Sequence, residues 1–178
     1  MEKEILNLVM ESKDSFKNAE LIMSAVKEAE QVMYDKYFRR LNECICEKYP
    51  NLVDWPEELE KEYNQYSIYY VVKTLKDGNK LCLEIACDQT MYAGFTVCDS
   101  NEEDIKCKGY ISQEDIMTGK WKSSDMWIAW KYMGYDMEER PNFKHHNDAF
   151  YNLLEEDGFN RFIEKSMDTI DELMRSLK

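Results

Sequence analysis

The segment QYSIYYVVKTLKDGNKLCLEIAC, residues 65–87, predicts an antiparallel β-hairpin. Apolar and polar side chains alternate through residues 66–75, as they do in a strand whose two faces meet different surroundings. Asp77–Gly78 is a strong turn signal, because glycine adopts positive φ without a Cβ clash. The return strand at residues 81–86 alternates again, with aliphatic side chains on one face. This hairpin predicts a β-sheet at the centre of the fold.

Two further segments extend the predicted sheet. MYAGFTVCD, residues 91–99, and IKCKGYIS, residues 105–112, have the composition of a third and a fourth strand. The loop SNEED joins them and gathers three acidic surface residues, Glu102, Glu103 and Asp104. Because the connections are short, neighbouring strands are predicted to run antiparallel.

The segment MWIAWKYMGYDM, residues 126–137, is dense in aromatic and methionine side chains. Its first eight residues are apolar on both faces of an extended chain, which is typical of a strand inside a sheet covered on both sides. A helix with both tryptophans on one stripe is also compatible with so short a segment. We expect a buried central strand followed by an exit loop. The alternative is a ligand-binding surface formed by Trp127, Trp130, Tyr135 and Asp136.

Helices are predicted before the sheet. Residues 2–11 form a short helix, and apolar residues at steps of three or four then continue through residues 16–44 without a proline. Capped by Asp14 or Ser15, this second helix has about 34 residues and spans on the order of 50 Å. We expect its second half to pack on the sheet and its first half to pair with residues 2–11 or with another copy of the protein. A further short helix is predicted at residues 56–64.

Two helices follow the sheet. The first begins at Asn147 or Asp148 and stops at Gly158, and the last has a clean amphipathic face. The order of elements predicts an α+β fold with an antiparallel sheet of about 4–5 strands, flanked by a long N-terminal helix and two C-terminal helices. Residues 1–65 form the N-terminal helical region, and residues 66–178 form the sheet with the C-terminal helices, together one α+β domain.

The net charge of −13 is spread along the chain. Residues 1–65 carry −6, residues 66–125 carry −3 and residues 126–178 carry −4. This distribution argues against direct binding to nucleic acid, which needs clustered lysine and arginine. An acidic surface can attract a basic protein partner, or it can serve solubility alone.

The N-terminal residues predict a cytoplasmic protein. They are acidic and lack the basic head and apolar run of a signal peptide, and no stretch approaches the roughly 18 apolar residues that span a membrane. In that compartment the six cysteines are expected to stay reduced. They contain no C-x-x-C pair, and the two histidines are adjacent in sequence, so we expect neither a metal nor a cofactor.

No catalytic motif stands out. Two carboxylates, Glu84 and Asp88, flank a strand end, as in metal-dependent nucleases that hold Mg²⁺ with an acid followed by an E-x-K triplet. In this chain Ala86 stands where that lysine would be. A solvated strand edge explains Glu84 without catalysis. The alternative is a divergent nuclease that takes its lysine from elsewhere, such as Lys73 or Lys80.

An aromatic strand followed by amphipathic helices characterises the second half of the chain. The residues of this pattern are Trp127, Trp130, Lys131 and Tyr132, then Phe150, Leu153, Gly158, Phe159, Phe162 and Ile163. From about Tyr66 to the end, the chain resembles the C-terminal accessory region of bacterial and prophage proteins classed as PD-(D/E)XK nuclease-like. Residues 1–65 leave no room for the nuclease core of those proteins, so no catalytic residue is carried over. The resemblance implies a bacterial or phage origin and a non-catalytic accessory domain.

Together these features predict a non-enzymatic, acidic protein–protein interaction module. We expect a homodimer formed through the N-terminal helix, and another protein as partner. In a more specific form, the chain is a phage-type inhibitor of a basic nucleic-acid-binding protein. The alternative is an accessory or divergent subunit of a Mg²⁺-dependent PD-(D/E)XK-like nuclease. Neither a membrane nor direct contact with nucleic acid is expected.

Overall fold

The structure, a computed structural model, describes residues 2–54, 60–62, 65–99, 103–134 and 140–178. The chain forms two compact units, Met1–Arg39 and Arg40–Lys178. The division therefore lies inside the long N-terminal helix, upstream of residue 65.

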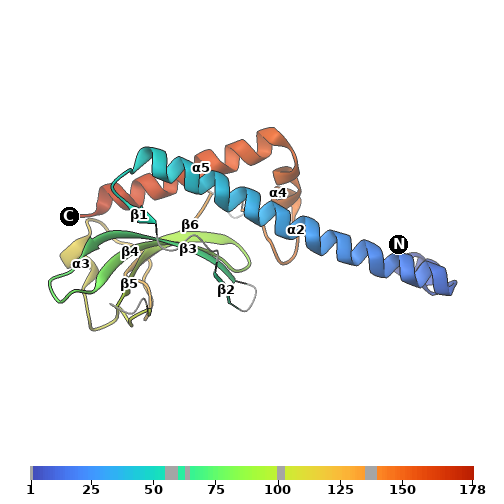
Figure 1. Cartoon of the computed structure of the whole chain (residues 1–178), viewed down its shortest axis with the longest axis horizontal. Helices are drawn as coiled ribbons and strands as arrows, with labels where there is room; N and C mark the ends of the chain where they lie inside the picture. The colour runs from blue at the N-terminus through green and yellow to red at the C-terminus, as the bar shows by residue number, and fades with distance from the viewer. Residues whose placement is uncertain (1, 55–59, 63–64, 100–102, 135–139) are drawn as a thin grey trace. The chain divides into compact units, whose positions relative to one another are not determined.

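Two helices begin the chain. Helix α1 spans Glu2–Met10, and helix α2 spans Lys13–Lys48, which confirms the predicted long N-terminal helix (Figure 1). The side-chain oxygen of Ser12 accepts a hydrogen bond from the backbone amide of Ser15 at 3.0 Å, as an N-cap does. The prediction that Asp14 or Ser15 caps α2 is wrong, because the helix starts directly after Ser12.

The described residues contain six strands, which form one antiparallel sheet. The bounds are β1 Val53–Asp54, β2 Glu60–Glu62, β3 Gln65–Thr74, β4 Lys80–Cys87, β5 Met91–Cys98 and β6 Ala129–Tyr132. The order is β1-β3-β4-β5-β6, and β2 also pairs with β3. The predicted β3–β4 hairpin is confirmed: Gly78 has a φ of 91°, and the register places Tyr69 opposite Glu84.

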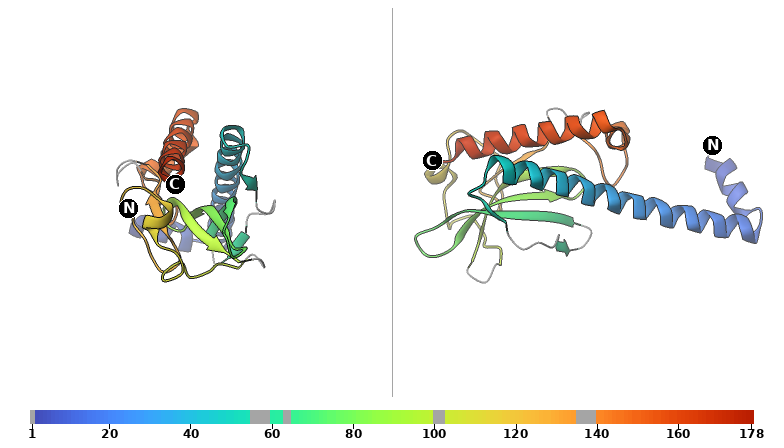
Figure 2. Two further views of the ribbon diagram at one scale, coloured as in Figure 1. Left: turned by 90° about the vertical axis from the view of Figure 1, so that its left-hand side faces the viewer. Right: turned by 45° about the horizontal axis from the view of Figure 1, so that its top comes forward.

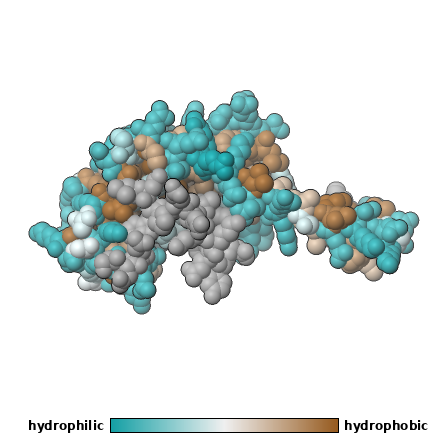
Figure 3. All heavy atoms as spheres, viewed as in Figure 1, coloured by the Kyte–Doolittle hydropathy of each residue, from teal (hydrophilic) through white to brown (hydrophobic). Residues whose placement is uncertain are grey.

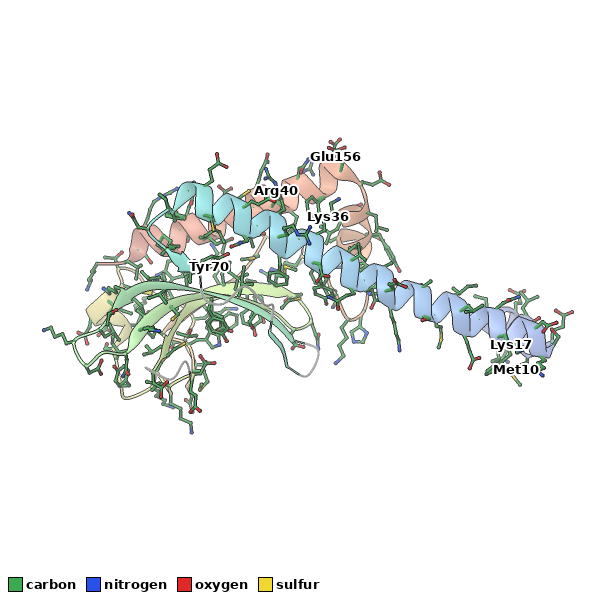
Figure 4. The ribbon with its side chains drawn as sticks, viewed as in Figure 1. Met10, Lys17, Lys36, Arg40, Tyr70 and Glu156 are labelled. Atoms are coloured by element: carbon green, nitrogen blue, oxygen red, sulfur yellow. The ribbon has the colours of Figure 1, made fainter. Side chains whose placement is uncertain are left out.

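A helical layer lies on one face of this sheet. Helix α5, Glu156–Ser176, and the part of α2 that belongs to the second unit lie side by side there (Figures 1 and 2). Tyr49 donates a hydrogen bond at 2.6 Å to the buried carboxylate of Asp171 on α5, which also accepts one from Lys48. Tyr70, labelled in Figure 4, donates from β3 to the side chain of Asn42 on α2 at 2.5 Å. These bonds join the two helices and the sheet.

Short helices complete the second unit. Helix α3 spans Gln113–Ile116, helix α4 spans Asp148–Tyr151, and a 3₁₀-helix continues from α4. Asn147 caps α4 through its side chain, as predicted. Gly158, however, lies inside α5 and does not end α4. A Cβ atom on Gly158 would lie 2.0 Å from the backbone oxygen of Asn152, so glycine permits a close approach between these two turns.

The predicted strand at residues 105–112 is wrong. The amide of Ile105 bonds to the carbonyl of Val97 at 2.8 Å, but the amide of Lys108 bonds to Asp125 at 3.2 Å. Gly109 then turns the chain with a φ of 83°. The backbone amides of this segment therefore form hydrogen bonds with different parts of the chain, and no regular strand pairing results.

Two other predicted elements also differ. Strand β6 takes up only Ala129–Tyr132 of the aromatic segment, and it is the last strand of the sheet path, where a central strand was expected. Glu60–Glu62 forms strand β2, so the predicted helix at 56–64 is wrong there, and its first residues, 56–59, lie outside the described residues. Pairing with β3 explains the extended conformation of Glu60–Glu62.

Candidate functional site

The N-terminal helices expose an unusual number of large apolar side chains. In the described residues, ten of the thirteen exposed large hydrophobic residues lie between residues 5 and 32. We call them the N-terminal apolar surface: Ile5, Leu6, Leu8, Met10, Phe16, Leu21, Ile22, Met23, Val26 and Val32. Brown apolar surface is visible over α1 and the adjoining turns of α2 (Figure 3). Contiguous apolar surface on a folded protein marks an interaction site.

The spacing on α2 gathers four of these residues on one face. At 100° per residue, Phe16, Ile22, Met23 and Val26 fall within about a third of the helix circumference. Leu21, on the same helix, points to the opposite side. Residues 1–39 carry eight acidic and six basic residues, a net charge of only −2. Of the two units, the one that exposes apolar side chains thus has the smaller net charge, −2 against −11.

Glu84 occupies the middle of the sheet. It is 4% exposed on β4, and the Ser67 hydroxyl donates to its carboxyl group at 3.4 Å. Burial, reinforced by the charge of Asp104 and partly opposed by hydrogen bonds from Tyr69 and Ser67, raises the pKa of Glu84 to about 8. The interpretation of Glu84 as a solvated strand edge is therefore wrong. At neutral pH this group is mainly a neutral acid, which is a poor ligand for Mg²⁺.

The other predicted acidic residues do not converge on Glu84 as a metal site. Asp88 is exposed in the turn after β4. It follows Glu84 by four residues, which corresponds to about 13 Å along an extended strand. Glu103 and Asp104 are exposed, and the Asp104 carboxylate accepts a hydrogen bond from the Cys98 thiol at 3.4 Å. In the described part of the chain, no cluster of three or more His, Cys, Asp or Glu side chains could hold a metal ion.

The structure brings Trp127 and Trp130 together around Tyr92. Their rings lie 5.3 Å and 6.0 Å from the Tyr92 ring, centroid to centroid, in edge-to-face contacts. Both indoles are half-buried. Trp127 lies directly over Gly94 of β5, where an added Cβ would come 2.7 Å from the indole Cε3 atom. The pair is therefore part of the packing at the β5–β6 edge, with one side of Trp130 open to a neighbouring cavity.

Three predicted site residues, Tyr135, Asp136 and Glu102, lie outside the described residues.

The cavity beside Trp130 has a basic lining that the sequence did not suggest. It has a volume of about 710 Å³ and lies between the segment 118–122, strand β6 and the end of α5. The charged residues among its described lining are Lys120, Lys122, Lys131, Arg140, Arg175 and Glu172. The short basic run GKWK at residues 119–122 was its one local signal. The remaining lining residues are far apart in sequence, so no spacing pattern connects them.

No protein-family model matches the chain, and no curated protein or solved structure has a significant similarity to it. None of the described helices combines the length and the apolar composition needed to cross a lipid bilayer.

Proposed function

We propose that the chain is a non-enzymatic protein–protein interaction module that forms a homodimer through one face of its N-terminal apolar surface, the face that carries Phe16, Ile22, Met23 and Val26. The observation that carries this proposal is the concentration of exposed apolar side chains on α1 and the first half of α2. Transferring such side chains from water to an apolar contact is favourable by roughly 25 cal/mol per Å².

Helix α1 supports a partner for this surface. It has nine residues, whereas isolated helices shorter than about 12–15 residues are marginal in water. Of its described side chains, only Val9 is partly buried. Packing against a partner would stabilise α1 in the way that tertiary contacts stabilise most protein helices.

The charge distribution favours a second copy as that partner. Residues 1–39 carry a net charge of −2, and the rest of the chain carries −11. Two copies that meet through their N-terminal helices bring together surfaces of nearly balanced charge, while their acidic units face solvent. A two-fold dimer places the same residue at the interface twice, so each substitution there acts twice.

The strongly acidic unit supports a basic protein as the external partner. Binding of that kind should weaken steeply with added salt, because exposed charges are screened within about 8 Å at physiological ionic strength. A divergent nuclease is less well supported, because its proposed ligand Glu84 is buried and mainly neutral at pH 7.

Sedimentation velocity on two matched variants tests the dimer. Met23, 62% exposed, lies on the α2 face with Phe16, and Leu21, 68% exposed, lies on the opposite side. Met23→Lys should weaken dimerisation at least 30-fold, since each copy loses about 1–2 kcal/mol of apolar burial. Leu21→Lys adds the same charge and should leave the dissociation constant within about 3-fold of the wild type, a free-energy change below roughly 0.7 kcal/mol. Equal effects of the two substitutions would contradict a specific interface on the Met23 face.

A further inference from the structure

The cavity beside β6 is a concentrated basic site in an acidic protein. Among the described residues, five cationic side chains and one carboxylate line it, and their charges sum to +4. Because the whole chain carries −13, all other residues together carry −17. Solubility does not explain such a local excess of positive charge, since the surrounding surface already supplies charge of the other sign.

Three of these cations have no carboxylate partner among the described residues. Lys131 pairs with Glu172 at 2.5 Å, and Arg175 pairs with Asp171 at 3.3 Å. Lys120, Lys122 and Arg140 form no such pair in the described part of the chain. Like charges gathered in one cavity repel each other, and an anion bound between them would relieve that repulsion.

Aromatic rings hold two of the unpaired cations in place. The Lys122 ammonium group lies 4.9 Å from the centroid of the Tyr132 ring and 5.0 Å from that of Trp130. The Arg140 guanidinium carbon lies 4.7 Å from the same Tyr132 ring. Both cations are thus preorganised around one phenol ring by cation–π contacts. Preorganisation lowers the entropy lost when a ligand binds.

Arg140 also presents an unused donor. Its Nε atom is buried and has no hydrogen-bond acceptor among the described residues. Buried donors are normally paired, so this unpaired nitrogen is unusual; because the atom is closed to solvent, an acceptor on a ligand would reach it only if the side chain shifts. Phosphate oxygens suit this position, because guanidinium groups bind them with charge-assisted hydrogen bonds.

The lining also offers flat apolar surfaces. The indole of Trp121 is fixed by a hydrogen bond from its Nε1 atom to the backbone oxygen of Thr118 at 3.0 Å. Trp130 and Tyr132 stand nearly perpendicular to each other, with ring centroids 5.0 Å apart. Aromatic side chains of this kind stack on planar heterocycles. The volume of about 710 Å³ lies in the range of sites for small molecules.

From these observations we infer that the cavity binds a free nucleoside diphosphate, with the phosphates against Lys120, Lys122 and Arg140 and the base against the tryptophans. The ligand charge of about −3 matches the three unpaired cations. A nucleic-acid strand carries the same chemistry, but it would extend beyond the cavity along a protein whose other residues carry a net charge of −17, which repels further phosphates. This inference is independent of the dimer, because the lining residues that the structure describes lie in the second unit.

The test is a titration of the full chain followed by tryptophan fluorescence and calorimetry. ADP should bind with a dissociation constant of about 1–100 µM, as expected for a ligand of this size. Adenosine, which lacks phosphate, and pyrophosphate, which lacks the base, should each bind at least 10-fold more weakly. No binding of ADP at millimolar concentration would overturn the inference. If pyrophosphate bound with the same affinity as ADP, the role of the aromatic rings would be overturned. If a single-stranded oligonucleotide bound more tightly than ADP, the choice of a free nucleotide would be overturned.

Variants locate the site. Lys122→Gln should weaken ADP binding at least 10-fold, and Arg140→Gln should do the same. Lys122 is exposed, so its substitution should leave the thermal unfolding midpoint nearly unchanged and keep the test valid if Arg140→Gln fails to fold. Lys106→Gln, an exposed lysine outside the cavity lining, is the matched control and should bind ADP like the wild type. Equal binding by the Lys122 and Lys106 variants would contradict the site.

Discussion

The buried carboxyl group of Glu84 should make the protein less stable as the pH rises. Its pKa in the folded protein is raised to about 8, above the ordinary value of 4.5 that applies to the unfolded chain. The folded state therefore binds the proton more tightly, and this contribution to stability is fully present below pH 4.5 and is lost as the pH rises towards 8. Between pH 5 and pH 8, these two pKa values of Glu84 correspond to a decrease of about 3 kcal/mol in the free energy of unfolding.

Glu84→Gln isolates this effect, because glutamine keeps the shape of the side chain and does not titrate. Urea unfolding at pH 5, 6, 7 and 8, at one fixed protein concentration, gives the free energy of unfolding of each variant. The wild type should lose most of the roughly 3 kcal/mol over this range, whereas Glu84→Gln should lose much less. The two proteins should be similar at pH 5 and differ most at pH 8.

Glu103→Gln is the matched control, because it also removes one carboxylate but from an exposed position. It should keep the pH dependence of the wild type. Although the Asp104 side chain is exposed, neighbouring protein groups partly desolvate its carboxylate and raise its pKa, so a small slope of the same sign should remain in Glu84→Gln. Parallel curves for the wild type and Glu84→Gln would refute the reasoning, since they would mean that the Glu84 carboxyl group titrates alike in the folded and unfolded chains.

Gly94→Ala, with Gly109→Ala as its control, tests the packing between β5 and β6, and Asp171→Asn tests the helical layer. Gly94→Ala should destabilise the fold by about 3 kcal/mol or more, because its Cβ would lie 2.1 Å from the backbone oxygen of Ala129. Gly109→Ala has open space around its Cβ and a φ of 83°, so it should cost only about 1 kcal/mol. Thermal unfolding of both variants measures the difference. Asp171→Asn should lower the free energy of unfolding by about 2 kcal/mol, because it weakens the hydrogen bonds from Lys48 and Tyr49. Burial alone would raise the pKa of Asp171, but those bonds lower it below its ordinary value. The stabilisation by the wild-type carboxylate should therefore be present at neutral pH and fade as the pH falls below about 4, which urea unfolding at pH 3 and pH 7 would detect. Equal losses for the two glycine variants, or no loss for Asp171→Asn at pH 7, would contradict these contacts.

Local signals in the sequence were sufficient for much of the fold. The Asp77–Gly78 turn and the alternation around it predict the β3–β4 hairpin, because turn chemistry and strand period act between near neighbours. The long helix α2 is predicted by its uninterrupted helical period. Alternation also assigned Glu84 to the less apolar face of β4, but it could not show that this face is covered. Segments from later in the chain, including Trp127, bury that face, and such contacts leave no periodic signal.

The two candidate sites also differ in how far local sequence patterns reveal them. The N-terminal helix was predicted as an interface because its excess length is visible in the sequence. The basic lining of the cavity could not be predicted, because Lys122, Arg140 and Arg175 come from three segments that meet only in the folded chain. Trp130 was recognised as a possible binding residue, but its cationic neighbours were not.

The mass of the wild-type chain in solution tests the central claim most directly. Multi-angle light scattering at tens of micromolar should give twice the chain mass of 21.3 kDa, because the α2 face that carries Phe16 and Met23 is then buried between two copies. A mass of 21.3 kDa at that concentration would contradict the proposal that this surface joins two copies of the chain.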